Sequence, residues 1–384
     1  MTPKSGGERS LVTDNPPAHA EAVIIGAGIA GLTAALRLAQ AGREVLVLDG
    51  SEPWRGGSGV NAGTLALQNK EPALLTFYRN GLDEWQRLSR ELDDDIGYIR
   101  AGGLRVASTQ ADAEALRQSA LEQARLGVET QWLEGSALRA RAPWLAATIA
   151  CATFCRADGL ANPLLAGRAL INAVTKAGGR VVSRAKLQAQ EEARWGYRLT
   201  TSRGPVECDQ VVIAAGPWSD GVARLFGVGL PMEAQTNMLS ITERLAQFMD
   251  SLVVTHVRGR FTLKQFPNGS CLLGGGFPGR GDKESGRKEL DYEQLRENLR
   301  FQCEVVPALR GAHLLRSWAG FQGSPPDGLP AIGPFPNRPG LFAAVSAGAG
   351  FTMGPVVGRL AAEAVLAGET PAAASRFRPG RLIA

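Results

Sequence analysis

The sequence predicts an α/β protein of two domains, and three observations support this prediction. The chain has 384 residues, more than the roughly 250 to 300 residues that one hydrophobic core usually serves. An apolar run, a glycine-rich turn and a helical pattern follow one another from residue 22, and a similar order recurs near residue 350. Between them, short apolar runs alternate with turn signals, as in antiparallel sheets. We expect a Rossmann-like domain and a discontinuous α+β domain built on an antiparallel sheet.

The composition indicates a globular chain and excludes several classes of protein. Hydrophobic residues make up 44% and charged residues 21% of the chain, as in ordinary folded domains. The 42 basic and 37 acidic residues form no long block of one sign, so no nucleic-acid partner is predicted. The five cysteines form no CxxC pair, which argues against disulfides or any metal site and favours the cytoplasm. No apolar run reaches the roughly 18 residues of a membrane span.

The first elements form a βαβ unit behind a tail. Residues 1–20 are rich in proline, glycine and polar groups, so we expect a flexible tail without a secretory signal. Residues 22–25 predict a buried strand, leucine and alanine then recur at helical spacing as far as Gly42, and residues 44–49 predict a second buried strand. This order opens a parallel sheet.

The later elements alternate between the two expected domains. The Rossmann-like domain is expected to comprise residues 21–82, 141–225 and 325–384, and the substrate domain residues 83–140 and 226–324. Helices are predicted at residues 71–92, 111–126, 162–177 and 354–366, and strands at residues 99–107, 180–189, 197–201, 210–215, 251–257, 260–266, 270–274 and 341–345.

Residues 26–31, GAGIAG, form a GxGxxG motif between a predicted strand and a predicted helix. Gly26 permits the tight turn, Gly28 lets the backbone approach a pyrophosphate, and Gly31 lets the helix pack closely on the strand. Asp49 ends the next strand, where a carboxylate would hold ribose hydroxyls. The pattern predicts a dinucleotide site, and a purely structural glycine turn is the alternative.

A second glycine-rich loop, residues 55–63, follows the second strand closely and carries hydroxyl and amide side chains. Such a loop is suited to wrap a diphosphate and the edge of a flavin, whereas a nicotinamide enzyme rarely needs one. A flexible surface loop is the alternative interpretation. The two loops together favour FAD over NAD.

Several motifs stand in the order in which one family of flavoproteins has them. They are GAGIAG from residue 26, GGSGVNAG from residue 56, the segment 158–163, VVIAAGPWS from residue 211, RSWAGFQGSPPDGLPAIGP from residue 316 and GAGFTMGPVVGRL from residue 348. The chain resembles the D-amino-acid oxidase superfamily, in the branch of glycine oxidase, sarcosine oxidase and the opine and hydroxyproline dehydrogenase β subunits. The resemblance runs from residue 20 to about residue 368.

The resemblance implies a noncovalently bound FAD, because the cysteine that carries the flavin in sarcosine oxidase aligns with Gly320. It also implies that the last helix points its N-terminus at the flavin, where the helix dipole stabilises the anionic reduced form. The residues expected to bind FAD are Gly26, Gly28, Ile29, Ala30, Gly31, Asp49, Gly50, Ser58, Asn61, Ala62, Gly63, Leu187, Gly216, Trp218, Gly350, Phe351, Thr352 and Met353.

Two departures from the family pattern concern the substrate. Glycine oxidase has an arginine for the substrate carboxylate where this chain has Gln322, and sarcosine oxidase has a lysine where this chain has Thr352. The resemblance implies no general base. Gln322, Trp318, Thr352 and His256 are the candidates for catalytic or substrate-facing residues.

A substrate carboxylate would therefore be bound by other residues. The strand run that such enzymes place over the flavin carries Arg258, Arg260, Lys264 and His256. Because side chains alternate along a strand, only some of these can face inward. Charged residues on a strand are more often solvated, and that is the alternative for each of them.

The resemblance implies hydride transfer from the carbon beside an amine nitrogen to flavin N5, giving an imine that hydrolyses. A secondary amine, an opine or another N-substituted amino acid is the favoured substrate. One alternative is a glycine or D-amino-acid oxidase that uses oxygen and releases hydrogen peroxide. Another is a flavin electron-transfer subunit that has no substrate site.

The expected electron acceptor follows from one further departure. Sarcosine oxidase has a lysine above the flavin that speeds its reaction with oxygen, and this chain has Leu272 at that position. We therefore expect a dehydrogenase, as the catalytic subunit of a hetero-oligomer whose partner subunits carry a second flavin or an iron–sulfur centre. We expect it in the cytoplasm, or peripheral at the inner membrane through its electron acceptor.

Overall fold

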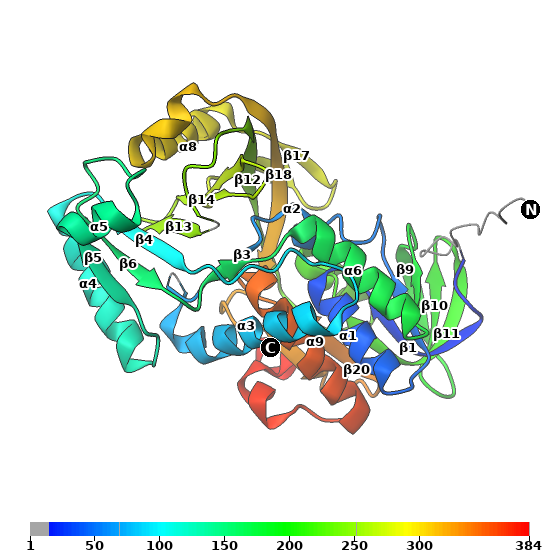
Figure 1. Cartoon of the computed structure of the whole chain (residues 1–384). Helices are drawn as coiled ribbons and strands as arrows, with labels where there is room; N and C mark the ends of the chain where they lie inside the picture. Colours follow the sequence, from blue (N-terminus) through cyan, green and yellow to red (C-terminus); the bar gives the residue numbers. More distant parts are fainter. Residues whose placement is uncertain (1–14, 69, 251, 384) are drawn as a thin grey trace, which may run out of the picture.

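The structure is a computed structural model that describes residues 15–68, 70–250 and 252–383. These residues are organised around two eight-stranded sheets. Figure 1 shows the first sheet and its helices at one end of the molecule and the second sheet, with α8, at the other. The expected α/β class, with a Rossmann-like part and a second, mainly antiparallel part, is confirmed. Residues 1–14 of the expected tail lie outside the described residues, and β1 begins within its last part, at His19.

The first sheet is parallel at its centre, where β1 pairs with β11 and β2. Its strands lie in the order β19-β20-β11-β1-β2-β8, and β10 and β9 extend it antiparallel beside β11. The strands are β1 (His19–Ile25), β2 (Val45–Leu48), β8 (Arg180–Val182), β9 (Leu187–Glu192), β10 (Tyr197–Thr201), β11 (Gly204–Ile213), β19 (Ala331–Pro334) and β20 (Leu341–Val345).

Apolar side chains cover both faces of this sheet. On β1, Ala22 and Ile24 pack against helices, whereas Val23 and Ile25 belong to a second core with β9, β10 and β11. This separation follows from the two-residue period of a strand. The helices on the first face are α1 (Ile29–Gln40), α3 (Leu75–Glu91), α6 (Pro163–Lys176) and α9 (Gly350–Ala367), and α7 (Ser219–Leu225) lies on the second.

The second sheet is antiparallel except for the pair of β13 and β4. Its order is β18-β12-β15-β14-β13-β4-β6-β5, and α8 (Tyr292–Val305) covers one face through Val305. The strands are β4 (Gly103–Ala107), β5 (Gln131–Glu134), β6 (Cys151–Cys155), β12 (Glu233–Arg244), β13 (Val253–His256), β14 (Thr262–Gln265), β15 (Ser270–Gly274) and β18 (Leu314–Ser324).

Shorter elements connect the two sheets. β3 (Thr64–Leu65) pairs with β7 (Gly159–Leu160), and β16 (Arg280–Asp282) forms a hairpin with β17 (Arg287–Glu289). Among the described residues, no helix is both long and apolar enough to cross a membrane. The remaining helices are α2 (Gly57–Val60), α4 (Gln110–Arg125) and α5 (Gly135–Arg141), with 3-10 turns at Pro72–Leu74, Gly216–Trp218, Pro307–Gly311, Ala372–Phe377 and Pro379–Leu382.

The last helix begins four residues earlier than predicted. It starts at Gly350 and contains Pro355. Proline lacks the N–H that would bond to the carbonyl four residues before it, which here is the carbonyl of Phe351. Trp85 Nε1 on α3 donates a hydrogen bond to this carbonyl at 2.9 Å. The distant tryptophan therefore satisfies the group that the proline leaves free.

One predicted strand covers parts of two observed strands, and several observed strands were not predicted, the longest of them β12 and β18. Residues 180–189 are divided between β8 and β9, because Arg184 has a left-handed backbone with φ 53°. Its N–H bonds to the Ser51 carbonyl at 2.8 Å. β12 and β18, which pair over most of their length, were not predicted as strands, because β12 is largely polar and β18 contains two glycines.

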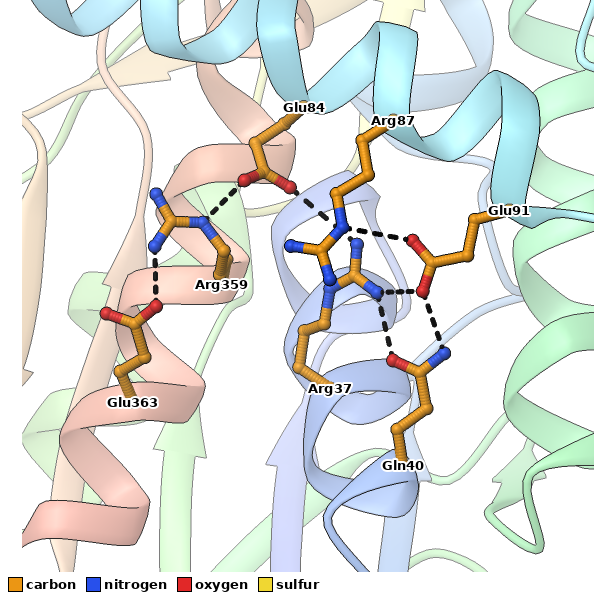
Figure 2. A network of polar contacts seen from close by, with 7 residues as sticks. All are labelled: Arg37, Gln40, Glu84, Arg87, Glu91, Arg359 and Glu363. Carbon is orange, nitrogen blue, oxygen red and sulfur yellow. Dashed lines mark hydrogen bonds and ion pairs between the residues drawn. The ribbon is translucent and has the colours of Figure 1, made fainter.

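A polar network joins three helices of the first sheet (Figure 2). Glu84 on α3 accepts a hydrogen bond from Arg359 Nε on α9 at 2.6 Å and lies 3.7 Å from Arg37 Nη2 on α1. All of α3 thus lies with α1 and α9, whereas β6 pairs with β4 and β5. We therefore propose domain boundaries after residues 91 and 155 in place of the expected ones after residues 82 and 140.

Candidate active site

The glycine turn between β1 and α1 has the close packing that a dinucleotide turn needs. Gly26 has φ 114°, and a Cβ at this residue would lie 2.5 Å from the Ala214 carbonyl oxygen. A Cβ at Gly31 would lie 2.0 Å from the Gly26 carbonyl oxygen, so only glycine allows this contact. Gly28 is the N-cap of α1 and has no polar side chain. Backbone N–H groups at the helix N-terminus thus face the place expected for a phosphate.

Asp49 lies beside this turn, directly after β2. Its Oδ2 accepts a hydrogen bond from the Ala27 N–H, and its Oδ1 accepts one from the Ser51 N–H, each at 2.8 Å. A carboxylate oxygen can accept a second hydrogen bond, so both oxygens can still accept from ribose hydroxyls. Gly50 follows in the same turn, where a Cβ would lie 3.7 Å from Lys186.

The second glycine-rich loop crosses the N-terminus of α1. Ser58 Oγ accepts a hydrogen bond from the Ile29 N–H at 2.9 Å. Asn61 closes the loop, since its Nδ2 donates to the Ser58 carbonyl and its Oδ1 accepts from the Gly63 N–H, both at 2.6 Å. Gly63 has φ 66°, and a Cβ there would lie 2.1 Å from the Ala161 carbonyl oxygen. The loop therefore has one tightly fixed conformation at the predicted phosphate position.

The last helix begins in contact with α1. A Cβ at Gly354 would lie 2.3 Å from Ile29 Cγ2, so the first turns of the two helices touch. The N-cap of α9 is Ala349, which has no polar side chain. The hydroxyls of Thr64 and Ser346 are buried and find no hydrogen-bond partner among the described residues. Two helix N-termini and two unsatisfied hydroxyls fit a bound flavin nucleotide, which carries phosphates and hydrogen-bonding ring edges.

The four residues predicted at the flavin ring form the first turn of α9. Gly350 lies close to Ser346, since a Cβ at Gly350 would be 3.3 Å from the serine Cβ. Phe351 packs on Trp85 with ring centroids 4.6 Å apart, and Met353 is fully buried. Thr352 Oγ1 donates a hydrogen bond to the Thr64 carbonyl at 3.1 Å. The Thr352 hydroxyl therefore holds the loop after α2 against α9.

The other predicted FAD residues lie at the edge of the first sheet. Gly216 has φ 54° at the start of the turn after β11. Trp218 Nε1 donates to the Lys283 carbonyl at 2.8 Å, and its ring lies 5.8 Å from that of Phe321. Leu187 begins β9 and is buried in the core of this sheet. The indole of Trp218 thus contacts the second part of the molecule.

One face of the second sheet is turned toward the loop after α2. Lys264 on β14 pairs with Leu272 on β15, so these two side chains share a face. Their neighbours Leu263 and Leu273 belong to the apolar core on the opposite face, under α8. Lys264 is fully buried, and its Nζ donates a hydrogen bond to the Ala62 carbonyl. The lysine therefore points toward the predicted flavin loop.

Trp318 and Gln322 lie on the same face of the second sheet. Trp318 Nε1 donates to the Val60 carbonyl of α2 at 2.9 Å. Gln322 Oε1 accepts a hydrogen bond from Asn237 Nδ2 at 3.1 Å. The structure thus brings two of the predicted substrate-facing residues, together with Lys264, onto one face opposite residues 57–63.

His256 was expected to face the substrate, and the structure places it on the opposite face of the sheet. Its ring packs against Phe301 on α8, with centroids 5.1 Å apart. Its Nε2 lies 2.9 Å from Ser108 Oγ, and burial lowers the pKa of His256 to about 4. A neutral, hydrogen-bonded histidine under α8 has a structural role, so we remove it from the candidate site.

Of the three basic residues on the same strand run, only Lys264 faces the site. Arg258 forms an ion pair with Asp112, at 2.6 Å between Nη2 and Oδ2. Arg260 lies over the Phe277 ring, 5.8 Å from its centroid, and is exposed. Strand alternation in the sequence already indicated that only some of these residues face inward.

Lys70 extends the charged cluster next to Lys264 and was not among the predicted site residues. Its Nζ lies over the Tyr78 ring, 5.5 Å from the centroid. Close by, Asp158 is 2% exposed and accepts hydrogen bonds from the Leu67 N–H at 2.8 Å and from Gln68 Nε2 at 3.0 Å. Lys70 lies in the polar stretch of residues 68–71, which is typical of a solvated loop. Nothing in the sequence distinguishes this lysine from an exposed loop residue.

The pKa values of these groups are shifted by burial. Burial lowers the pKa of Lys70 to about 8, although the Asp158 carboxylate acts in the opposite direction. Burial, and then the charge of Lys70, lowers the pKa of Lys264 to about 7. Burial raises the pKa of Asp158 to about 6 in spite of its hydrogen bonds. All three shifts disfavour the charged form, as expected where water is excluded.

Comparison with known proteins shows the family. The model of the family described as "FAD dependent oxidoreductase" matches residues 21–364, so this chain belongs to that family. FAD is its cofactor, as the resemblance in the sequence implied.

Individual relatives are distant. One of the subunits of the opine oxidase of Rhizobium meliloti is 26% identical over 330 residues, covering 83% of this chain and 86% of that protein. Glycine oxidase of Bacillus licheniformis is 25% identical over 363 residues, covering 90% and 93%. The crystal structure of glycine oxidase from Geobacillus kaustophilus has a TM-score of 0.86 at 24% identity, covering 96% of this chain and all of that one, and shows the same fold.

Proposed function

We propose that this FAD-dependent oxidoreductase oxidises the C–N bond of a small amine or amino acid, and that N-substituted amino acids are preferred to glycine. The observation that carries the proposal is the face of the second sheet opposite residues 57–63, where Trp318 and Gln322 lie. Gln322 is paired with Asn237 in a neutral amide contact. A site without an arginine at this position does not depend on one bidentate carboxylate contact.

The protein's contribution to this reaction is orientation, because the cofactor carries the chemistry. FAD, which residues 26–31, Asp49 and residues 57–63 would hold, would supply the acceptor for a hydride from the carbon beside the amine nitrogen. The nitrogen lone pair would form the C=N bond as its proton leaves to solvent, and water would hydrolyse the imine to a carbonyl compound and an amine. Trp318 limits the space above the loop, and Gln322 and Asn237 supply neutral hydrogen-bonding groups. Thr352 holds the loop in place.

The structure contains a cation close to Leu272, which bears on the electron acceptor. The expectation of a dehydrogenase rested on Leu272, and the structure places Lys264 directly beside it on the adjacent strand. A fixed cation near the flavin would stabilise superoxide as it forms. The absence of a lysine at residue 272 therefore no longer argues against oxygen as the electron acceptor. The rate at which oxygen reoxidises the reduced flavin must be measured directly.

A role within a larger dehydrogenase of several chains is also proposed, supported by the name of the opine oxidase relative, which describes that protein as one subunit of an enzyme. Partner subunits with a second flavin or an iron–sulfur centre would then receive the electrons. The four cysteines on the described strands are all buried, so they offer no exposed thiol cluster for such a centre on this chain. Copurification from the native host, followed by mass determination, tests this assembly.

The oxidation itself is tested by anaerobic bleaching of the bound flavin. N-methylglycine, opines, secondary amines, and D- and L-amino acids are added singly, and bleaching by an N-substituted amino acid is the expected result. 2-Methylalanine, which has no hydrogen on the carbon beside its nitrogen, is the matched control and should leave the flavin oxidised. Air is then admitted. In an oxidase the reduced flavin is reoxidised quickly and hydrogen peroxide forms, whereas in a dehydrogenase the flavin is reoxidised slowly. If no amine bleaches the flavin while dithionite does, the proposal is wrong and an electron-transfer role is favoured.

A further inference from the structure

The buried charges beside the loop after α2 are not balanced by the protein. Lys264 on β14 and Arg105 on β4 share one face of the second sheet, since Thr255 pairs with Arg105 and with Thr262, which is two residues before Lys264. Lys70 adds a third cation from the chain after β3. The Asp158 carboxylate raises the pKa of Lys70, whereas the charge of Lys70, which has the same sign as that of Lys264, lowers the pKa of Lys264. The cluster has an excess of positive charge.

Neither lysine has a protein counter-ion in contact with it. The Lys264 ammonium has three N–H donors and gives one of them to the Ala62 carbonyl, while its side chain is 0% exposed. The Lys70 ammonium, on a partly buried residue, contacts the Tyr78 ring and, within the described part of the chain, makes no hydrogen bond or ion pair. A buried charge is costly unless it is paired. Two such charges, one bonded to the loop after α2 and the other on the chain that follows β3, indicate a site for an anion.

The two lysines lie at the predicted flavin site. The hydroxyl of Tyr78, under Lys70, lies beside the turn before α9, 3.7 Å from the place that a Cβ at Gly348 would take. Lys264 bonds to Ala62 in the loop that crosses the start of α1. An anion held between the lysines therefore lies next to the turn where the flavin ring is expected.

We propose that Lys70 and Lys264 together bind the carboxylate of the substrate, in place of the anchors that are missing at residues 322 and 352. This inference rests on the proposed function and deepens it, because it requires a substrate that carries a carboxylate beside its amine. An N-substituted amino acid satisfies that requirement, whereas a simple amine leaves the two lysines without a counter-ion.

The pKa shifts of the lysines give the proposal a pH dependence. A carboxylate between them favours their charged forms, so it raises both pKa values from about 7 and about 8. Binding should therefore take up protons near pH 8, and affinity should fall as the pH rises above that value. The other groups around the cluster do not titrate there. Asp158 is ionised there, with a pKa of about 6, and Cys155 is protonated, with a pKa of about 12. Burial raises the pKa of Tyr78, which stays neutral, and an arginine such as Arg105 does not lose its proton in this range.

The test measures binding of an anion that cannot be oxidised at a C–N bond. (Methylthio)acetate has sulfur in the place of the nitrogen of N-methylglycine, and (methylthio)acetamide is its neutral counterpart. Titration calorimetry uses the FAD-loaded protein at pH 7 and pH 9, in two buffers that differ in ionisation enthalpy so that proton uptake is counted. The variants are Lys70→Met and Lys264→Met, with Lys70→Arg as a charge-preserving variant. Lys176→Met, at an exposed ion pair with Asp93, is the matched control.

The expected result is binding of the acid with proton uptake, weakened about tenfold or more in each methionine variant, since one charge-assisted contact is lost. Lys70→Arg should regain most of the affinity, and Lys176→Met should bind as the wild type does. The visible flavin spectrum of each variant reports that it is folded and loaded. Equal binding by wild type and both methionine variants, or equal binding of acid and amide, would overturn the inference. If the acid binds as expected while no amine bleaches the flavin, the anion site stands and the proposed oxidation is wrong.

Discussion

Asp49 is the residue through which the first sheet is proposed to hold the ribose of FAD. Its two carboxylate oxygens already accept backbone hydrogen bonds from Ala27 and Ser51, so its position is fixed before the cofactor arrives. Asp49→Ala should weaken FAD binding roughly 10- to 100-fold, because a charge-assisted hydrogen bond contributes about 1.5 to 3 kcal/mol. Titration of the apoprotein with FAD, followed by protein fluorescence, measures this change.

The matched control for Asp49 is Asp209→Ala. Asp209 is half-exposed and contacts His19 at 3.4 Å, away from the glycine turn, so its removal should leave FAD affinity unchanged. Acid precipitation of the wild type should release yellow FAD into the supernatant, as expected of a noncovalent cofactor. An Asp49→Ala protein that binds FAD as tightly as the wild type would show that the ribose is held elsewhere.

At the scale of single residues, local geometry was predictable and distant partners were not. The role of Gly26 follows from a turn that the sequence shows on both sides, and the structure has the tight contact there. Lys264 meets Ala62, which is 202 positions away in the chain, and no spacing rule connects such residues. His256 was misplaced for the same reason, since the face on which a strand residue lies depends on which strands pair with it.

At the scale of helices, Glu84 is the residue that joins α1, α3 and α9 (Figure 2). Its carboxylate is the partner of both Arg37 and Arg359, and Arg37 is 9% exposed. Glu84→Gln should destabilise the protein by about 1.5 kcal/mol, because both arginines lose one charged partner while Arg37 keeps Glu91 and Arg359 keeps Glu363. Thermal unfolding of the FAD-loaded protein measures the loss as a lower Tm.

Glu363→Gln is the matched control for this network. Glu363 pairs with the same Arg359, but its side chain is 45% exposed, so its loss should cost about 0.5 kcal/mol or less. If both variants melt at the same temperature as the wild type, the network does not stabilise the three helices.

Helices and strands were predictable where neighbouring residues in the sequence determine both their hydrophobic pattern and their ends. Residues 270–274 and 341–345 were predicted with the bounds that the structure has, because turn residues flank each apolar run. The start of α9 was not predictable, since its first turn depends on a hydrogen bond from Trp85. β12 stayed unpredicted because its partner, β18, compensates for a weak pattern by pairing along most of its length.

At the scale of the whole molecule, the hairpin of β16 and β17 connects the second sheet to the first. Lys283 in its turn forms an ion pair with Asp220 on α7, at 2.6 Å, and both side chains are less than 20% exposed. Asp220→Asn should free the hairpin and speed tryptic cleavage after Arg280, Arg287 and Lys288 several-fold, because a contact of about 1.5 kcal/mol no longer opposes local opening. Timed digestion with mass spectrometry measures the rate at each bond.

Asp93→Asn is the control for the hairpin, since it removes an exposed ion pair with Lys176 at the end of α6, and α6 and α7 cover opposite faces of the first sheet. Its cleavage pattern should match that of the wild type. Cleavage of Asp220→Asn at the wild-type rate would show that the hairpin is held by other contacts, such as the Trp218 hydrogen bond.

The first sheet and the helix that covers α1 are completed by the last part of the chain. β20 and α9 lie at residues 341–367, and Gly354 and Gly358 of α9 pack directly on Ile29 and Ala30 of α1. During synthesis the N-terminal residues leave the ribosome first, so α1 must wait with an apolar surface uncovered while about 300 further residues are translated. The nascent chain can acquire its cofactor only after β20 and α9 have been translated. A ribosome that stalls before residue 341 releases a product that chaperones and proteases recognise by this uncovered helix.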